Sequence, residues 1–177
     1  MPERSYPFVN GLTTDAEFSR MFAPLFGASI LDGLAVTADA SGLNVKLAPG
    51  AGFVRGHFYG STEQQTLTIA GGDSAPRIDT IILRLEYGSV NAIHAVVKKG
   101  TPASSPVRPT LVQTTDGIYE LALADITVAA GAVTIPASAV LDRRVWLAQS
   151  LQQSAHIFSG TAPTNPAVGD LWFEPIA

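Results

Sequence analysis

The chain has 177 residues, no cysteine, and a formal net charge of −4 from 11 basic and 15 acidic residues. Its few, scattered basic residues argue against a nucleic-acid partner, and the lack of cysteine excludes disulfides, thiolate nucleophiles and thiolate metal sites. Only 15% of the residues are charged, against about 25% in an ordinary soluble domain. We therefore expect part of the surface to be covered by other subunits; the alternative is an alanine-rich domain that stands alone.

The N-terminal sequence "MPERSYPFVNG" lacks the apolar core of a secretory signal. No apolar run approaches the roughly 20 residues that a membrane helix needs. We therefore expect a protein that is made in the cytoplasm without a signal peptide and that does not insert into a membrane.

The stretch "TTDAEFSRMFAPLFG" predicts a short helix. Thr14 and Glu17 fit a capping box at its start, Gly27 suits its end, and Pro24 is expected to end the regular part early. Four large apolar residues follow helical spacing and share a face. They are predicted to pack either on the sheet of the same chain or against a neighbouring subunit: Phe18, Met21, Phe22 and Leu25.

From residue 34 onward, apolar and polar residues alternate as on half-buried strands. Val45 and Leu47 share one face of "LNVKLAPG", and "TLTIA" at 66–70 is a short strand. "RIDTIILRLEYG" and the returning "AIHAVVKKG" predict a hairpin, "TPASSPVRPT" an extended connector, and "GIYELALADITVAAGAVTIP" a second hairpin turning at Ala130–Gly131. No helix-period segment separates successive strands, so the sequence predicts a mainly β fold with a β-sandwich-like domain.

The predicted organisation has three parts: an N-terminal arm and helix at 1–33, a β domain at 34–145 and a C-terminal extension at 146–177. The extension is expected to be irregular or partly helical, with a second helix in "SAVLDRRVWLAQSLQQSA" capped by Ser138. Trp172 and Phe173 lie in a stretch rich in turn formers. They are predicted to fold back onto the chain's own sheet or to anchor a partner, since aromatics often carry binding energy.

The glycine-rich stretch "PGAGFVRG" at 49–56 raises the question of a phosphate-binding loop. Its glycines are spaced G-x-G-x-x-x-G, one residue longer than the dinucleotide fingerprint, and no helix-period segment follows. We therefore predict a turn at Pro49–Gly52, a strand in "FVRGHFY", and at Gly56 a bulge or a close backbone approach. No cofactor is expected.

Other chemistry is sparse. His57, His94 and His156 lie too far apart in sequence for a metal-ligand motif, and the carboxylates are dispersed. Arg77 with Asp79, and Asp142 with Arg144, are two residues apart in sequence; we predict local ion pairs, with a subunit boundary as the alternative. The sequence predicts no catalytic residue and no metal ligand, and hence no enzyme.

Several stretches, in chain order, resemble tail and baseplate structural proteins of tailed bacteriophages. They match the N-terminal module of baseplate upper or receptor-binding-type proteins over about residues 6–144: "YPFVNG", "DAEFSRMFAPLFG", "GLAVTA", "LNVKLAPGAGFVRGHFY", "PRIDTIILRLE", "AVVKKGTPASSPVRP", "YELALADITV" and "LDRR". "GTAPTNPAVGDLWFE" is similar to a segment that recurs in phage tail fibres.

The resemblance implies a virion component of the tail tip, baseplate or tail fibre. Such a protein is expected to form a homotrimer, to contact other tail or baseplate proteins and to support host attachment, with a host surface glycan as a further partner. Two alternatives stay open. One is a head decoration or collar protein; the other is a carbohydrate-binding module whose candidate ring residues are Tyr59, Tyr87 and Trp146.

Overall fold

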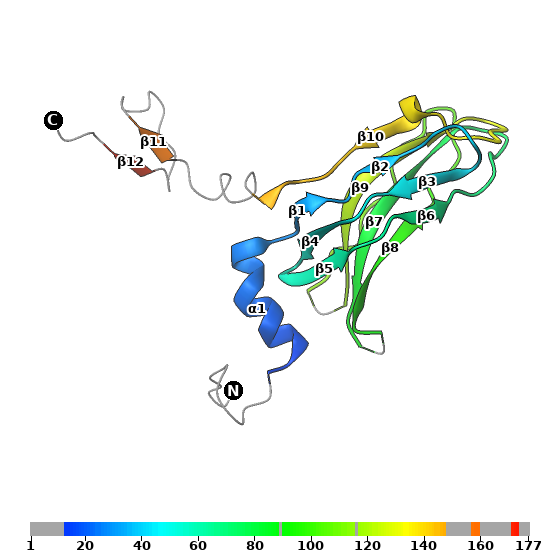
Figure 1. The fold of residues 1–177 in the computed structure, drawn as a ribbon. Coiled ribbons are helices and arrows are strands. Elements are labelled where there is room, and N and C mark those ends of the chain that lie inside the picture. The colour runs from blue at the N-terminus through cyan, green and yellow to red at the C-terminus, as the bar shows by residue number, and fades with distance from the viewer. Residues whose placement is uncertain (1–12, 89, 116, 148–156, 160–170, 174–177) are drawn as a thin grey trace.

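The computed structural model describes residues 13–88, 90–115, 117–147, 157–159 and 171–173 (Figure 1). Its helices and strands, in chain order, are α1 (Asp15–Phe26), β1 (Ser29–Gly33), β2 (Val36–Thr37), β3 (Asn44–Leu47), β4 (Gly50–Val54), β5 (His57–Ser61), β6 (Gln65–Thr68), β7 (Arg77–Glu86), β8 (Ala92–Lys98), β9 (Ile118–Val128), a 3-10 helix (Ala137–Ala139), β10 (Val140–Asp142), β11 (Ile157–Ser159) and β12 (Leu171–Phe173). Strands dominate, and the predicted mainly β fold with a short N-terminal helix is confirmed.

One layer of the sandwich is the antiparallel sheet β10-β9-β7-β8. The predicted hairpin between β7 and β8 is confirmed. The pairing of β7 with β9 contains one bulge, where Leu123 of β9 has no partner. The bulge changes which side chains face inward. As a result Leu123 and Ala124 both join the core, while Asp125 accepts a 2.8 Å hydrogen bond from Thr80.

The facing layer consists of two three-stranded sheets, β1-β4-β5 and β2-β3-β6. Because β2 follows β1, β4 follows β3 and β6 follows β5, the two sheets form one three-stranded meander with a break across its middle (Figure 1). The Leu34 N–H donates to the Pro49 carbonyl at 3.1 Å within this break. A Cβ on Gly33 would lie 2.1 Å from the Pro49 oxygen, so this crossing requires glycine.

The core lies between the two layers, where alternate residues of each strand point inward. Val45 and Leu47 of the meander are fully buried, as their spacing predicts. The opposite sheet contributes these residues of β7 and β9: Ile81, Leu83, Leu85, Leu121, Leu123, Ala124, Ile126 and Val128. Burial of this apolar surface is the main source of stability for the sandwich. Its largest members are Ile30, Leu34, Leu47, Ile69, Ile81, Leu83, Leu123, Ile126 and Ile135.

The predicted proline-rich connector forms no strand between Thr101 and Leu111. It is fixed near both ends by buried carboxylates of the sheet. The Gly100 N–H donates to Asp79 Oδ1 at 2.8 Å, and the Val112 N–H donates to Glu120 Oε2 at 2.7 Å. These two hydrogen bonds hold the connector in place. The connector cannot form a β-ladder of its own, because its prolines lack backbone N–H donors.

The prediction for the glycine-rich stretch is wrong in its details. Gly50–Val54 is strand β4 rather than the end of a turn, and "FVRGHFY" is not one strand. It contains a two-residue turn at Arg55 and Gly56, with φ of +51° and +80°. Such a turn needs positive φ at both positions and usually carries Asn-Gly, so Arg55 hides it in the sequence. The close backbone approach predicted at Gly56 is confirmed.

Three further local predictions are corrected by the structure. Pro24 does not end the helix early: α1 continues to Phe26, since a proline in the last turn removes only one hydrogen bond. The chain turns at Ala130–Gly131 but does not return directly as a strand; β10 returns only after residue 139. Ser138 caps no α-helix, because Val140–Asp142 is strand β10. Residues 148–155 of the predicted second helix lie outside the described residues.

The pairing of β1 with β4 places residues 29–33 against the sandwich, although the predicted division assigns them to the N-terminal arm. Ile30 also forms an isolated parallel bridge with Trp146. The division at residues 33 and 145 stays a prediction. In the described part of the C-terminal extension, β11 and β12 pair in parallel.

Candidate partner interface

Helix α1 begins at the capping box that the sequence predicts. The Glu17 N–H donates to Thr14 Oγ1 at 3.3 Å, and the Thr14 N–H donates to Glu17 Oε2 at 2.9 Å. The helix ends at Gly27, whose φ is +57° and whose N–H donates to the Ala23 carbonyl at 2.8 Å. Both ends are thus fixed by local chemistry, as short helices require.

One face of α1 docks on the β4–β5 turn. Ser19 is only 2% exposed, and its hydroxyl donates to the Arg55 carbonyl at 2.9 Å. The Gly56 N–H donates to the Gly27 carbonyl at 3.1 Å. A Cβ on Gly56 would lie 2.5 Å from the Ala23 nitrogen, so the turn and the helix backbone are in direct contact. This contact sets the rotation of α1 about its axis.

Five phenylalanines form a continuous row from α1 across the sheet. Ring centroids lie 4.5 Å apart for Phe18 and Phe22, 6.0 Å for Phe22 and Phe26, and 4.4 Å for Phe26 and Phe53. Phe53 then meets Phe58 edge to face at 5.8 Å. These spacings are those of favourable aromatic pairs. The row holds the rings at its two ends, Phe18 and Phe58, in place on the surface.

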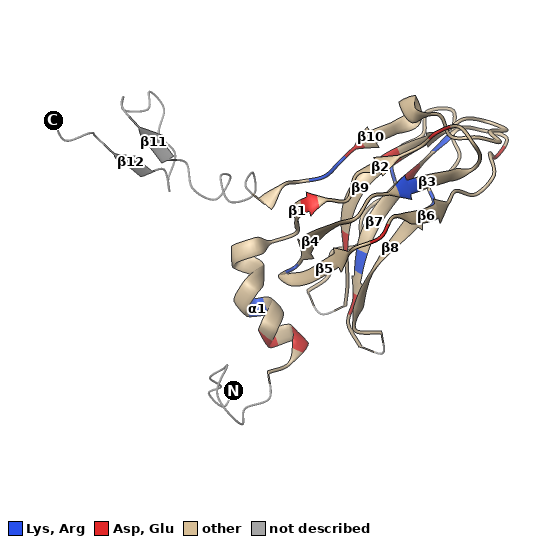
Figure 2. Ribbon diagram, in the orientation of Figure 1, with Lys and Arg blue, Asp and Glu red and all other residues tan. Residues whose placement is uncertain are grey.

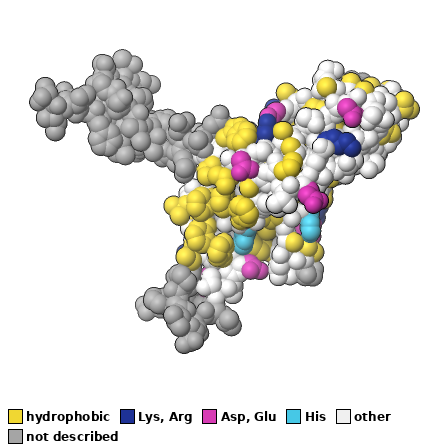
Figure 3. Space-filling view, in the orientation of Figure 1, with side chains coloured by type: hydrophobic (Ala, Val, Ile, Leu, Met, Phe, Trp, Pro, Cys, Tyr) yellow, Lys and Arg dark blue, Asp and Glu magenta, His cyan; other side chains and the backbone are white. Residues whose placement is uncertain are grey.

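Much of this region remains exposed. Phe18 is 42% exposed, Leu25 55%, Leu31 47% and Phe58 62%. We call these four residues the apolar patch. Figure 3 shows hydrophobic side chains gathered over α1 and the adjoining strands β1 and β5. Contiguous exposed apolar surface on a folded domain is typical of a protein interaction site.

The four predicted helix residues separate into different environments. Phe22 is half-buried within the aromatic row, Met21 is half-buried, and Phe18 and Leu25 belong to the apolar patch. A contact between these four residues and a partner stays a prediction. The backbone of Trp172 and Phe173 lies in β12, paired with Phe158 and Ser159, and their side chains lie outside the described part of the chain.

Sequence reasoning missed the strand residues of the patch. Phe53 and Phe58 are directly opposite each other because the two-residue turn pairs β4 with β5. The signal in the sequence was the Arg55-Gly56 pair between Phe53 and Phe58. This pair forms a two-residue turn in which Arg55 replaces the usual Asn. Leu31 is irregular in register, at a bulge between Ile30 and Asp32. Alternation after the fully buried Ile30 would place its side chain outward, but residues 29–33 were not predicted to form a strand.

His57 lies at the edge of the patch. Its Nε2 is 3.0 Å from the Tyr87 hydroxyl, and its ring centroid is 5.5 Å from that of Phe18. Partial burial lowers the pKa of His57 below its ordinary value of 6.5, and the charge of Arg55 acts in the same direction. The carboxylate of Asp15 acts in the opposite direction. The neutral imidazole is therefore the favoured form in the folded protein.

Acidification is expected to weaken the packing around His57. The unfolded chain binds a proton at this site at a higher pH than the folded chain does, so the contribution of His57 to stability is complete above about pH 6.5 and declines as the pH falls. Urea unfolding at about pH 7.5 and about pH 5 should show a larger loss for the wild type than for His57→Gln. His94→Gln, at an exposed position of β8, is the control. Equal losses in all three proteins would contradict this prediction.

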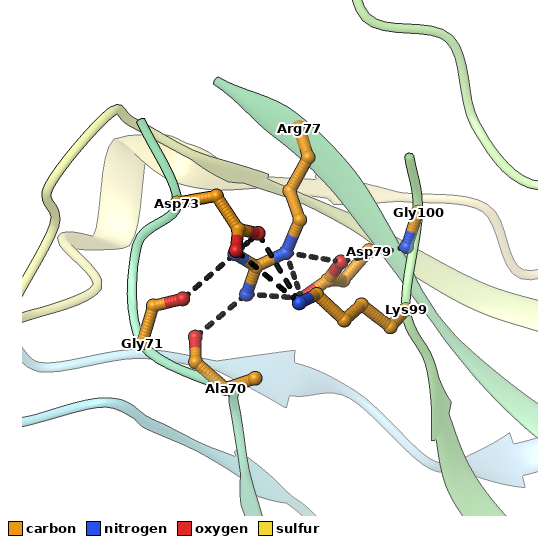
Figure 4. A network of polar contacts seen from close by, with 7 residues as sticks. All are labelled: Ala70, Gly71, Asp73, Arg77, Asp79, Lys99 and Gly100. Carbon is orange, nitrogen blue, oxygen red and sulfur yellow. Dashed lines mark hydrogen bonds and ion pairs between the residues drawn. The ribbon is translucent and has the colours of Figure 1, made fainter. Parts of the chain in front are cut away.

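An extensive buried polar cluster lies at the other end of the sandwich (Figures 1 and 4). Arg77, fully buried, donates through Nε to Asp79, through Nη1 to the Gly71 carbonyl and Asp73, and through Nη2 to the Ala70 carbonyl and Asp79. The predicted Arg77–Asp79 ion pair is confirmed. Its complete burial was not predicted, although the covering Gly71 and Ala70 carbonyls come from the loop just before β7, 6 and 7 residues earlier in the chain.

This cluster is chemically saturated. All the guanidinium donors are used, and the hydrogen bonds with Asp79 raise the pKa of Arg77. The partly exposed Asp73 also binds Lys99 Nζ at 3.2 Å, and that hydrogen bond is the main cause of its lowered pKa. Such an arrangement stabilises a loop but leaves no group free for acid–base chemistry.

A pocket of about 270 Å³ lies beside β2 and β10. Its ionisable lining residues, Asp142 and Arg144, bind each other at 2.6 Å, as the sequence predicts, and Arg144 Nη1 donates to the Gly33 carbonyl at 2.7 Å. The rest of the lining is aliphatic apart from one threonine: Val36, Thr37, Ala38, Ala124, Ala137 and Val140. The lining offers no histidine and no hydroxyl–base pair of the kind that nucleophilic catalysis uses.

Other candidate groups are dispersed as well. No group of three potential metal ligands occurs among the described residues, and His156 lies outside them. Lys and Arg are scattered rather than gathered on one side in Figure 2. The ring candidates for a glycan are all half-buried: Tyr59 accepts a hydrogen bond from Gln65, Tyr87 contacts His57, and Trp146 lies under Arg144.

The described residues include no helix of the length and apolar character needed to cross a membrane. Compared with known protein families, with curated proteins and with solved structures, the chain matches none of them.

Proposed function

We propose that this chain is a structural component of the tail tip, baseplate or tail fibre of a tailed bacteriophage. In this role it assembles as an oligomer, expected to be a homotrimer, contacts other tail proteins and supports host attachment. The proposal assigns it no catalytic activity and no cofactor. It begins from the phage-like segments, which occur in order along one chain.

The observation that carries the proposal is the apolar patch on an otherwise well-packed sandwich. Phe18 and Phe58 expose 42% and 62% of their surface, yet both belong to an ordered row of rings. Exposed aromatics held in a fixed position are typical of the anchors of protein interfaces. A domain that offers such a surface, and whose Arg77 cluster has all its guanidinium donors in use, suits assembly better than catalysis.

The test is to locate the chain in phage particles. Particles of the phage whose genome encodes this sequence would be purified, analysed by mass spectrometry and labelled with a gold-conjugated antibody raised against the recombinant chain. We expect the chain in the particles, with label at the distal end of the tail. Label on the head or collar would overturn the tail assignment in favour of a decoration or collar protein. Absence from intact particles would overturn both.

A further inference from the structure

Helix α1 has two separate non-polar sides. One side faces the sandwich and consists of Ser19, Phe22, Ala23 and Phe26, at intervals of three and four residues. The other side consists of Phe18, Met21 and Leu25, which we call the seam. Because each residue advances about 100° around a helix, the seam lies well to one side of the docked face. The docking contacts on Ser19 and Gly56 therefore leave the seam partly exposed: Phe18 and Leu25 are exposed and Met21 is half-buried.

The spacing of the seam matches helix-to-helix packing. Phe18 to Met21 is three residues and Met21 to Leu25 is four, which is the alternation that inserts side chains between those of a neighbouring helix. The seam contains no charged residue. The acidic residues Asp15 and Glu17 lie in the first turn of α1, and the last turn carries no basic residue. The three seam residues therefore bring no charged side chain of their own into a contact between two copies.

The exposed area is also of the size that such a contact needs. Phe18, Leu25, Leu31 and Phe58 are between 42% and 62% exposed, which for side chains of this size amounts to about 400 Å² in total. A standard interface buries about 800 Å² on each partner, of which somewhat more than half is non-polar. The apolar patch thus supplies most of the non-polar area that one side of a stable interface requires.

We infer that the seam of α1 packs against the α1 seam of a second copy of this chain, with Leu31 and Phe58 at the margins of the contact. The inference rests on the proposed assembly role and names the surface through which copies meet. Phe18 is already held against Phe22 at 4.5 Å and near His57, so little side-chain freedom is lost on association. The molecular mass measured by light scattering gives the number of copies in the oligomer.

The first experiment measures association of the full chain. Wild type and Phe18→Ser/Leu25→Ser would be compared by light scattering after size exclusion and by sedimentation over a wide concentration range. We expect the wild type to form dimers or trimers, and the double variant to need at least about 100-fold higher concentration for half-association. Val107→Ser/Val133→Ser is the matched control, because these residues are 77% and 76% exposed and lie outside the patch. Circular dichroism checks that each variant is folded.

The second experiment uses the absence of native cysteine. Leu25→Cys should form a disulfide-linked dimer on mild oxidation, under conditions where Val133→Cys stays largely without an intermolecular disulfide. A wild type that remains monomeric throughout, an oligomer that persists in the seam double variant, or equal cross-linking at both positions would overturn the inference. The particle labelling described above is independent of these results, so failure of the seam and failure of the phage assignment are distinguishable.

Discussion

Arg77→Ala is expected to lower the free energy of unfolding by about 3–5 kcal/mol, the cost of leaving a buried charge without its partner. Arg77 and Asp79 have no exposed side-chain surface, and their closest N–O distance is 2.9 Å. Removing the guanidinium leaves the Asp79 carboxylate with the Gly100 N–H as its remaining partner. It also leaves the Ala70 and Gly71 carbonyls without their donors.

Urea unfolding followed by tryptophan fluorescence and circular dichroism measures this loss. Lys99→Ala is the matched control, since Lys99 joins the same cluster through Asp73 but is 50% exposed, and we expect it to cost less than about 1 kcal/mol. Arg77→Met combined with Asp79→Leu should recover a large part of the stability, because apolar residues can replace a buried ion pair. A loss under about 1 kcal/mol for Arg77→Ala would contradict the account of the cluster.

Gly56→Ala is expected to cost about 3 kcal/mol and to detach α1 from the sandwich. Gly56 has φ of +80°, and an added Cβ would lie 2.5 Å from the Ala23 nitrogen and 2.8 Å from the Phe22 carbonyl carbon. Both atoms belong to backbone, so the clash cannot be relieved by a side-chain rotation. Strain of the positive φ adds to the displacement of the helix.

Limited proteolysis and hydrogen exchange at residues 15–26 should show the detachment, and denaturant unfolding its cost. Gly131→Ala separates the two causes: it also has a positive φ, +63°, but nothing lies within 4 Å of the added atom. We expect that control to cost about 1 kcal/mol and to leave α1 protected. If both variants behaved alike, the contact between the turn and the helix would not be what holds α1 in place.

Much of the fold could be predicted because its signals are local. The capping box at Thr14 and Glu17, the alternation around Val45 and Leu47, and the β7–β8 hairpin each depend on residues close in sequence. Some failures were local, at the Arg55–Gly56 turn and at Pro24, and others occurred where a distant partner decides. The irregular segment before β10 is tied to the other layer, because the Ile135 N–H donates to the Gly42 carbonyl at 3.0 Å. Nothing in the sequence near residue 135 indicates that bond.

By itself the sequence determined that the chain is mainly β, that a capped helix precedes the strands, and that Val45 and Leu47 share a buried face. The tertiary structure alone decided which side of α1 is covered, since the Ser19 hydroxyl and the Gly56 backbone set its rotation and leave Phe18 and Leu25 outside. It also decided that Arg77 is buried. Hydrophobic periodicity specifies which residues share a face, whereas exposure depends on which other segments reach that face.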